Sequence, residues 1–343
     1  MNCLQFFPKN KPVLALPNWH TPKLLISGKN PLLQRWKNCG FYPAYKTSAR
    51  LYRLFLKTKA AMGIGETRNN QSSRAVLEFF LDGILPDVTD LVLRIGTPGP
   101  TQKITIQFRD QSGDIIAYLK YAEKNEARIR LYHEYKILSQ LPRQLGPKVL
   151  KYDAVGDGVG LLLSPLTGKP LSVSIQPPNT VNDFLSKLIT QTAVPIQSHP
   201  TIQQLIEAED DRINKCIDAL AARHWPVVIA HGDFAPWNIL YKSDHSLIAF
   251  DWEYGSFQGF PHMDLIYYIL QVSALVYRWR PKKSISYLIN YLTQSGFTLS
   301  GQKEIQALIA LAAYLSNQQG IADGLTTDNY LQQWRTEVFK SVL

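Results

Sequence analysis

The sequence predicts an α+β chain with two lobes, in which a small antiparallel β-rich lobe precedes a larger, mainly helical lobe. Between residues 88 and 166, short apolar runs with β-branched residues alternate with turn sequences such as GTPGPT and RDQSGD. A stretch rich in Pro and Ser, TGKPLSVSIQPPNT, then separates this part from the rest of the chain. From Val181 onward the apolar residues recur mostly at helical spacing.

The composition indicates a globular protein. Of the 343 residues, 45% are hydrophobic and 19% are charged, which excludes a disordered or fibrous chain. No apolar run reaches the roughly 18 residues that a membrane span needs. The N-terminus lacks the basic start and apolar core of a secretory signal. The scattered, odd cysteines (Cys3, Cys39 and Cys216) favour reduced thiols, so a cytoplasmic location is expected.

Residues 1–74 are predicted to form a basic, aromatic-rich N-terminal extension. They contain 13 Lys or Arg and one acid, Glu66, interleaved with aromatic residues as in ARLYRLFLKTK. Helical spacing covers residues 47–63, and the polar stretch 65–74 reads as a linker. The extension is either a solvated basic flank or a docking surface for an anionic partner such as a membrane face. Nucleic acid is not expected, because no OB-fold or RRM pattern accompanies the basic charge.

Residues 75–166 are predicted to form the β-rich lobe, and residues 167–343 the helical lobe. A short helix, AVLEFFLDGIL, opens the first of these. The segments LVLRIG, KITIQF and IIAYLKYA then predict a three-stranded antiparallel meander. The helix EARIRLYHEYKILSQL follows, and KVLKYDAVGDGVGLLLSPL predicts two more strands around a Gly-Asp-Gly turn.

Two segments of the helical lobe, HGDFAPWNIL and SLIAFDWEYG, carry a cluster of polar residues. Asp233 and Asn238 lie five apart on one loop, and Asp251 ends the next short strand. We therefore expect the three oxygen-bearing side chains to converge. Asp and Asn are hard oxygen ligands suited to Mg²⁺, and a carboxylate beside the metal could take a proton from a hydroxyl group.

The motifs HGDFAPWN and DWE resemble those of the aminoglycoside phosphotransferase and choline kinase family, distant relatives of the protein kinases. The resemblance covers roughly residues 88–330 and implies a protein-kinase-like fold, ATP and Mg²⁺ as cofactors, and phosphate transfer to an alcohol group. It assigns the catalytic base to Asp233 and the Mg²⁺ ligands to Asn238 and Asp251. It makes His231 a brace for the loop and Asp264 the acid that stabilises it.

The resemblance also assigns the nucleotide site in the β-rich lobe. Lys120 would bind phosphate with Glu134 as its ion-pair partner, the alternative being an edge-strand lysine that faces solvent. Gly96 and Gly99 would lie in a phosphate-covering turn. Backbone groups near Ser164 and Leu166 would bond the adenine, although a plain buried strand is an equal reading of that segment.

The acceptor stays open between a sugar, an amino alcohol and a glycan precursor. Residues 252–343 hold seven basic and six acidic side chains, which argues mildly against a polycationic aminoglycoside. A set of aromatic residues could cage a quaternary ammonium, but at helical spacing such residues are more often core. These are Tyr254, Phe257, Phe260, Tyr267, Tyr268, Tyr277 and Trp279. The alternative to an enzyme is a catalytically silent scaffold of the same fold that docks to an anionic partner or a membrane surface.

Overall fold

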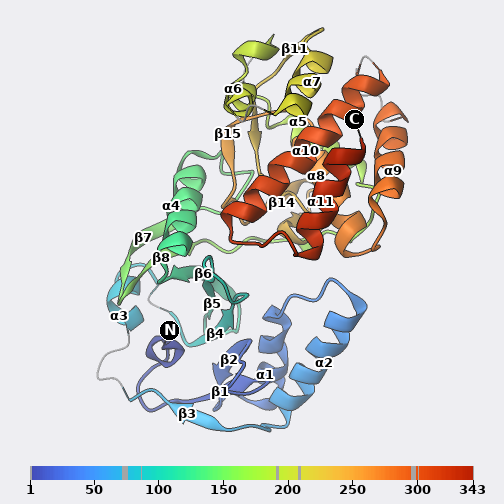
Figure 1. Ribbon diagram of the computed structural model, residues 1–343. Helices are drawn as coiled ribbons and strands as arrows, with labels where there is room; N and C mark the ends of the chain where they lie inside the picture. Colours follow the sequence, from blue (N-terminus) through green and yellow to red (C-terminus); the bar gives the residue numbers. More distant parts are fainter. Residues whose placement is uncertain are drawn as a thin grey trace. The chain divides into compact units, whose positions relative to one another are not determined.

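The computed structural model describes residues 2–71, 76–85, 87–190, 193–207, 210–294, 299 and 301–342. It divides into two compact units. Unit 1 comprises Met1–Ser139 and Pro147–Leu166, and unit 2 comprises Gln140–Gly146 and Thr167–Leu343. Unit 1 is β-rich and unit 2 is mainly helical (Figure 1), which confirms the predicted α+β class.

Unit 1 is built on one eight-stranded sheet in the order β3-β1-β2-β4-β5-β6-β8-β7, with every neighbouring pair antiparallel. The predicted meander is confirmed as β4 (Asp90–Ile95), β5 (Ile104–Arg109) and β6 (Ile115–Ala122). The two further predicted strands are β7 (Val149–Val155) and β8 (Gly158–Leu163). The helices of this unit are α1 (Leu32–Asn38), α2 (Thr47–Ala61), α3 (Val76–Leu81) and α4 (Asn125–Gln140), and short 3-10 turns lie at Cys3–Phe6 and Cys39–Phe41.

Residues 1–74 do not stand apart as an extension, which corrects the sequence-based expectation. Strands β1 (Pro12–Leu16), β2 (Leu24–Ser27) and β3 (Thr67–Asn69) extend the sheet beyond β4. The predicted linker over 65–74 holds β3, and its last three residues lie outside the described ones. Along β1, Val13 and Ala15 enter one hydrophobic core, while Leu14 and Leu16 enter a second core with α2. Apolar burial on both faces of β1 and β2 ties the segment to unit 1.

Unit 2 is organised around two buried helices. Every residue of α8 (Met263–Leu275) from Met263 to Ala274 is buried, and α10 (Gln302–Ala322) packs against α7, α8, α9 and α11. The other helices are α5 (Asn179–Ser186), α6 (Pro200–Ile206), α7 (Asp211–Leu220), α9 (Pro281–Gln294) and α11 (Tyr330–Ser341). Two two-stranded sheets (β10-β11 and β12-β15) and a three-stranded sheet (β14-β13-β9) complete the unit. Their strands are β9 (Lys169–Pro170), β10 (Val194–Pro195), β11 (His224–Trp225), β12 (Val228–Ala230), β13 (Ile239–Tyr241), β14 (Leu247–Ala249) and β15 (Ser256–Gly259).

All three cysteines are free, and Cys39 and Cys216 are buried. Over the part of the chain that the structure describes, we find no helix with both the length and the apolar character that crossing a membrane requires.

Candidate active site

The HGD segment forms the loop between β12 and β13, and the β13–β14 hairpin brings the DWE segment to it. In the hairpin, Ile239 pairs with Ala249, and the Phe250 N–H donates to the Asn238 carbonyl at 2.9 Å. Asn238 and Asp251 therefore emerge at the same end of the hairpin. Asp251 has a positive φ of 72°, a conformation uncommon outside glycine and frequent at functional sites.

The backbone of the loop is held by Asp264, the second residue of α8. One carboxylate oxygen accepts the His231 N–H at 2.7 Å, and the other accepts the Gly232 N–H at 2.9 Å. Burial raises the pKa of Asp264 to about 6, and the two backbone donors oppose that rise. Both oxygens are thus committed to the backbone of the loop, the arrangement that a stabilising role requires.

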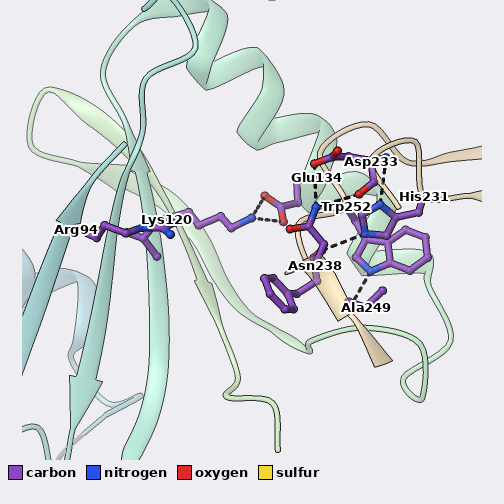
Figure 2. A network of polar contacts seen from close by, with 10 residues as sticks. Arg94, Lys120, Glu134, His231, Asp233, Asn238, Ala249 and Trp252 are labelled. Atoms are coloured by element: carbon purple, nitrogen blue, oxygen red, sulfur yellow. Dashed lines mark hydrogen bonds and ion pairs between the residues drawn. The ribbon is translucent and has the colours of Figure 1, made fainter. Parts of the chain in front are cut away.

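His231 is fully buried and braces the loop from within (Figure 2). With the Nε2 tautomer, its ring donates to the Phe250 carbonyl at 3.0 Å, and Nδ1 accepts the Asp233 N–H at 3.2 Å. Its ring lies 4.6 Å from that of Trp252, which is also fully buried and donates to the Ala249 carbonyl at 3.0 Å. His231 therefore links the loop to the DWE segment without offering a ring nitrogen to a substrate.

Glycine at position 232 is required by space as well as by conformation. Gly232 has φ +78°, and a Cβ there would lie 2.4 Å from the Tyr254 carbonyl oxygen. No side chain fits at that distance, so the loop can approach the residues after DWE only with glycine here.

The Asp233 carboxylate is half-buried and held by two neutral donors. The Tyr267 hydroxyl donates to Oδ1 at 2.7 Å, and the Asn238 amide Nδ2 donates to Oδ2 at 2.8 Å. Burial raises the pKa of Asp233 to about 7, and the charges of Asp251 and Glu253 push in the same direction. The carboxyl group is therefore held in a fixed orientation and has a pKa near neutral pH, as a general base requires.

The candidate metal ligands supply hard oxygen atoms. Both hydrogen bonds of the Asn238 side chain use Nδ2, one to Oδ2 and one to the carbonyl of Asp233. Its Oδ1 and the Asp251 carboxylate are the two oxygen-bearing groups of the candidate ligand set. No group of three or more His, Cys, Asp or Glu residues suited to a metal occurs within the described ranges. A two-ligand set of this kind fits Mg²⁺, which takes few protein ligands and completes its shell with water and phosphate.

In unit 1, Lys120 and Glu134 form the predicted pair. Lys120 Nζ lies 2.5 Å and 2.7 Å from the two carboxylate oxygens of Glu134, a residue of α4 that is fully buried (Figure 2). Lys120 pairs with Thr105 on one side and Leu161 on the other. Strand β6 is thus an inner strand of the sheet, and the reading of Lys120 as a solvent-facing edge lysine is wrong.

The remaining predicted nucleotide residues lie at the ends of strands in unit 1. Gly96 follows β4, where a Cβ would lie 2.7 Å from the Lys103 carbonyl oxygen across the turn. The Gly99 carbonyl accepts from Lys124 Nζ at 2.7 Å. Ser164 follows β8, and both its N–H and its hydroxyl bond the backbone of Lys148. The Ser164 N–H is therefore committed to Lys148, which leaves the Ser164 carbonyl as the backbone group it can offer to a base, and Leu166 follows two residues later.

The sequence did not reveal that the Tyr267 hydroxyl binds the Asp233 carboxylate. In the sequence, Tyr267 was only one of the aromatic residues that could form an ammonium cage or belong to the core. Tyr267 lies three residues after Asp264 on α8, so both side chains project from one helical face toward the loop. This spacing is the signal that could have identified it. Two other members of the proposed cage are also engaged: the Tyr254 hydroxyl donates to Asp323, and Lys283 lies 4.1 Å from the centre of the Trp279 ring.

Comparison with known proteins supports the resemblance to a family of phosphotransferases. Residues 181–308 match the model of the phosphotransferase enzyme family, a segment that contains both the HGD and the DWE motifs. This match confirms the resemblance seen in the motifs. No curated protein matches the chain.

Several solved structures are similar at low identity. The aminoglycoside phosphotransferase APH(3'')-Id from Streptomyces rimosus, in complex with ADP and streptomycin, is 19% identical over 64% of this chain and 92% of its own, with a TM-score of 0.36. Ethanolamine kinase from Plasmodium vivax is 14% identical over 85% and 90% of the two chains, with a TM-score of 0.45. Choline kinase LicA from Streptococcus pneumoniae is 14% identical over 78% and 98%, with a TM-score of 0.45.

Proposed function

We propose that this chain, a phosphotransferase with an alcohol group as acceptor, moves the γ-phosphate of ATP to a hydroxyl of a small molecule. The observation that carries the proposal is the Asp233 carboxylate, which Tyr267 and Asn238 orient within a loop that Asp264 and His231 brace. In this role Asp233 accepts the proton of the acceptor hydroxyl. The acceptor oxygen forms a bond to the γ-phosphorus of ATP as the bond from that phosphorus to the bridging oxygen breaks, and ADP leaves.

The chain's own groups would divide the remaining work. Asn238 Oδ1 and the Asp251 carboxylate would hold Mg²⁺, which supplies positive charge to the transferring phosphate. Lys120 would bind the phosphates, with Glu134 fixing its position. The Gly96–Gly99 turn would cover the phosphates, and the Ser164 carbonyl and the Leu166 N–H would bond adenine.

A catalytically silent scaffold has less support. Loss of turnover in such folds normally accompanies loss of the base, the metal ligands or the lysine, and the sequence keeps all four residues. The engaged aromatic residues give little support to an ammonium cage, so we propose a sugar, an amino alcohol or a glycan precursor as acceptor without preferring choline. The basic charge of residues 1–74 would serve docking to an anionic surface rather than phosphate transfer.

An acceptor screen tests the proposal. Purified protein is incubated with ATP, Mg²⁺ and a panel of sugars, amino alcohols and glycan precursors. ADP release is followed, and phosphorylated product is identified by mass spectrometry. We expect acceptor-dependent ADP release, abolished in Asp233→Asn and unchanged in Asp183→Asn, a matched substitution at an exposed position of α5. Nucleotide binding without transfer to any acceptor would favour the scaffold.

A further inference from the structure

Helix α2 carries two apolar stripes, of which its own unit covers one. Leu56 and Ala60 are buried in the core beneath β1 and β2, with Tyr52 packed against them. A second stripe, made of residues that fall on one side of the helical wheel, faces outward. It comprises Leu51 (65% exposed), Leu54 (50%), Phe55 (51%) and, just beyond the helix, Met62 (60%). A helix on the surface of a domain needs only the buried stripe, so the exposed stripe indicates a surface that binds a partner.

The surroundings of the outward stripe are uniformly basic. Helix α2 contains Arg50, Arg53, Lys57 and Lys59 and no acid, and the adjacent α1 contains Arg35 and Lys37 and no acid. Figure 1 shows α1 and α2 side by side in unit 1. On a helical wheel, Arg50 and Lys59 fall on opposite margins of the stripe. The surface therefore presents aliphatic and aromatic side chains between cationic margins.

We propose that the outward stripe of α2, flanked by Arg50 and Lys59, docks this protein on an anionic lipid membrane. Helices that lie in a membrane interface bury Leu and Phe side chains below the headgroups and place Lys and Arg against anionic lipid. A second copy of the chain fits this surface less well. In a two-fold contact, the basic margins of one chain would lie against the basic margins of the other, and like charges repel. The stripe offers one aromatic side chain, Phe55, among aliphatic ones rather than a series of aromatic rings on which bases stack, which disfavours nucleic acid. The inference stands independently of phosphate transfer.

Vesicle co-sedimentation tests the proposal with the 343-residue chain. Vesicles of phosphatidylcholine, with and without phosphatidylserine, are pelleted at low and at high salt. We expect the protein to pellet with phosphatidylserine vesicles at low salt, and less at high salt, because salt screens the basic margins. The triple variant Leu51→Ser, Leu54→Ser, Phe55→Ser should weaken partitioning by at least roughly tenfold. The variant Arg50→Gln, Lys59→Gln should weaken it roughly fivefold per charge, equivalent to about 1 kcal/mol each.

Two controls separate docking from loss of structure or self-association. Ile129→Ser removes an equally exposed apolar side chain (60%) from α4 and should leave partitioning unchanged. The thermal melts of all variants should match the wild type, since the substituted side chains are exposed. The proposal is overturned if the wild type fails to pellet with phosphatidylserine at low salt, or if the triple variant still pellets like the wild type. It is equally overturned if the wild type is a dimer without lipid and the triple variant is a monomer.

Discussion

In unit 1 the buried carboxylate of Glu134 receives a charged donor, Lys120, whereas in unit 2 the two donors to the carboxylate of Asp233 among the described residues, Tyr267 and Asn238, are neutral. Both carboxylates have both oxygens engaged, so hydrogen-bond satisfaction does not distinguish them. The difference lies in compensation of charge: an ion pair neutralises the first, while burial raises the pKa of the second to about 7. One site is built to hold a cation in place, and the other is built to exchange a proton.

The largest expected effect comes from replacing the Asp233 carboxylate, the group proposed to accept a proton. Asp233→Asn keeps the size of the side chain and removes the base, so kcat should fall by roughly 10²- to 10⁴-fold while nucleotide binding survives. Because the variant also removes a buried charge without a cationic partner, its melting temperature should equal or exceed that of the wild type. Steady-state kinetics with an acceptor from the screen, and a thermal melt, measure both. A large drop in melting temperature would show that Asp233 is mainly structural.

Removing the cation in unit 1 should have the opposite consequence for stability. Lys120→Met removes the cation that is paired with the buried Glu134 carboxylate, at an expected cost of about 3–5 kcal/mol in the free energy of unfolding. The double variant Lys120→Met, Glu134→Leu should recover much of this loss, while Lys136→Met, at an exposed position of the same helix as Glu134, should change little. Urea titrations measure all three. If the single and double variants are equally unstable, the ion pair is not the source of the loss.

His262 extends the comparison to a buried base. Burial and the charge of Arg223 lower its pKa from 6.5 to about 4. Between pH 6.5 and about 4, the unfolded chain therefore binds more protons at His262 than the folded chain does. Stability that is present above pH 6.5 is lost as the pH falls toward 4. We expect the lowered pKa of His262 to contribute about 2 kcal/mol to the free energy of unfolding above pH 6.5. Solvent screening reduces this contribution because the side chain is partly exposed.

The variant His262→Asn tests this contribution, because Asn tolerates the positive φ of 67° at this position. The raised pKa values of Asp233 and Asp264 act in the opposite direction, since the folded state then binds more protons as the pH falls. Those contributions are present in both proteins, so the difference between the two urea-stability profiles isolates His262. Parallel profiles between pH 7 and 4 would contradict the assignment.

The smallest effect is expected from one neutral donor. Tyr267→Phe removes the hydroxyl that orients Asp233 and should lower kcat roughly tenfold, with about 1 kcal/mol lost in stability. The neighbouring substitution Tyr268→Phe, in a buried tyrosine that packs near Phe234, serves as the matched control. If Tyr267 acts through Asp233, Tyr267→Phe should have no further effect on kcat in the Asp233→Asn background. Additive losses would instead indicate a separate structural role.

The parts that sequence reasoning predicted are those with a clear period or a specific motif. The alternating apolar runs predicted β4, β5 and β6, and helical spacing over residues 47–63 predicted α2. Strands β1 and β2 were missed because both of their faces are buried. Such strands show no alternation, and the high basic charge around PVLAL and LLIS suggested a flank rather than a sheet.

In the candidate site, sequence identified the side chains but not their directions. The motif named Asp233, Asn238 and Asp251, because residue types and spacing are visible in a sequence. The hydroxyl of Tyr267 was missed because an aromatic residue at helical spacing has the same pattern whether its tip is in the core or on a carboxylate. The positive φ of Asp251 depends on the hairpin around it, which no local propensity encodes.

The β13–β14 hairpin has a consequence for finding relatives of this chain. Asn238 and Asp251 are neighbours because Ile239 pairs with Ala249, and not because they lie thirteen positions apart. The turn between the strands closes with the Lys242 N–H on the Ser246 carbonyl and could lengthen without altering that pairing. A search pattern with a rigid gap would therefore overlook sequences whose turn has gained or lost residues. A pattern anchored on the two short apolar strands, with an elastic gap between them, would retain them.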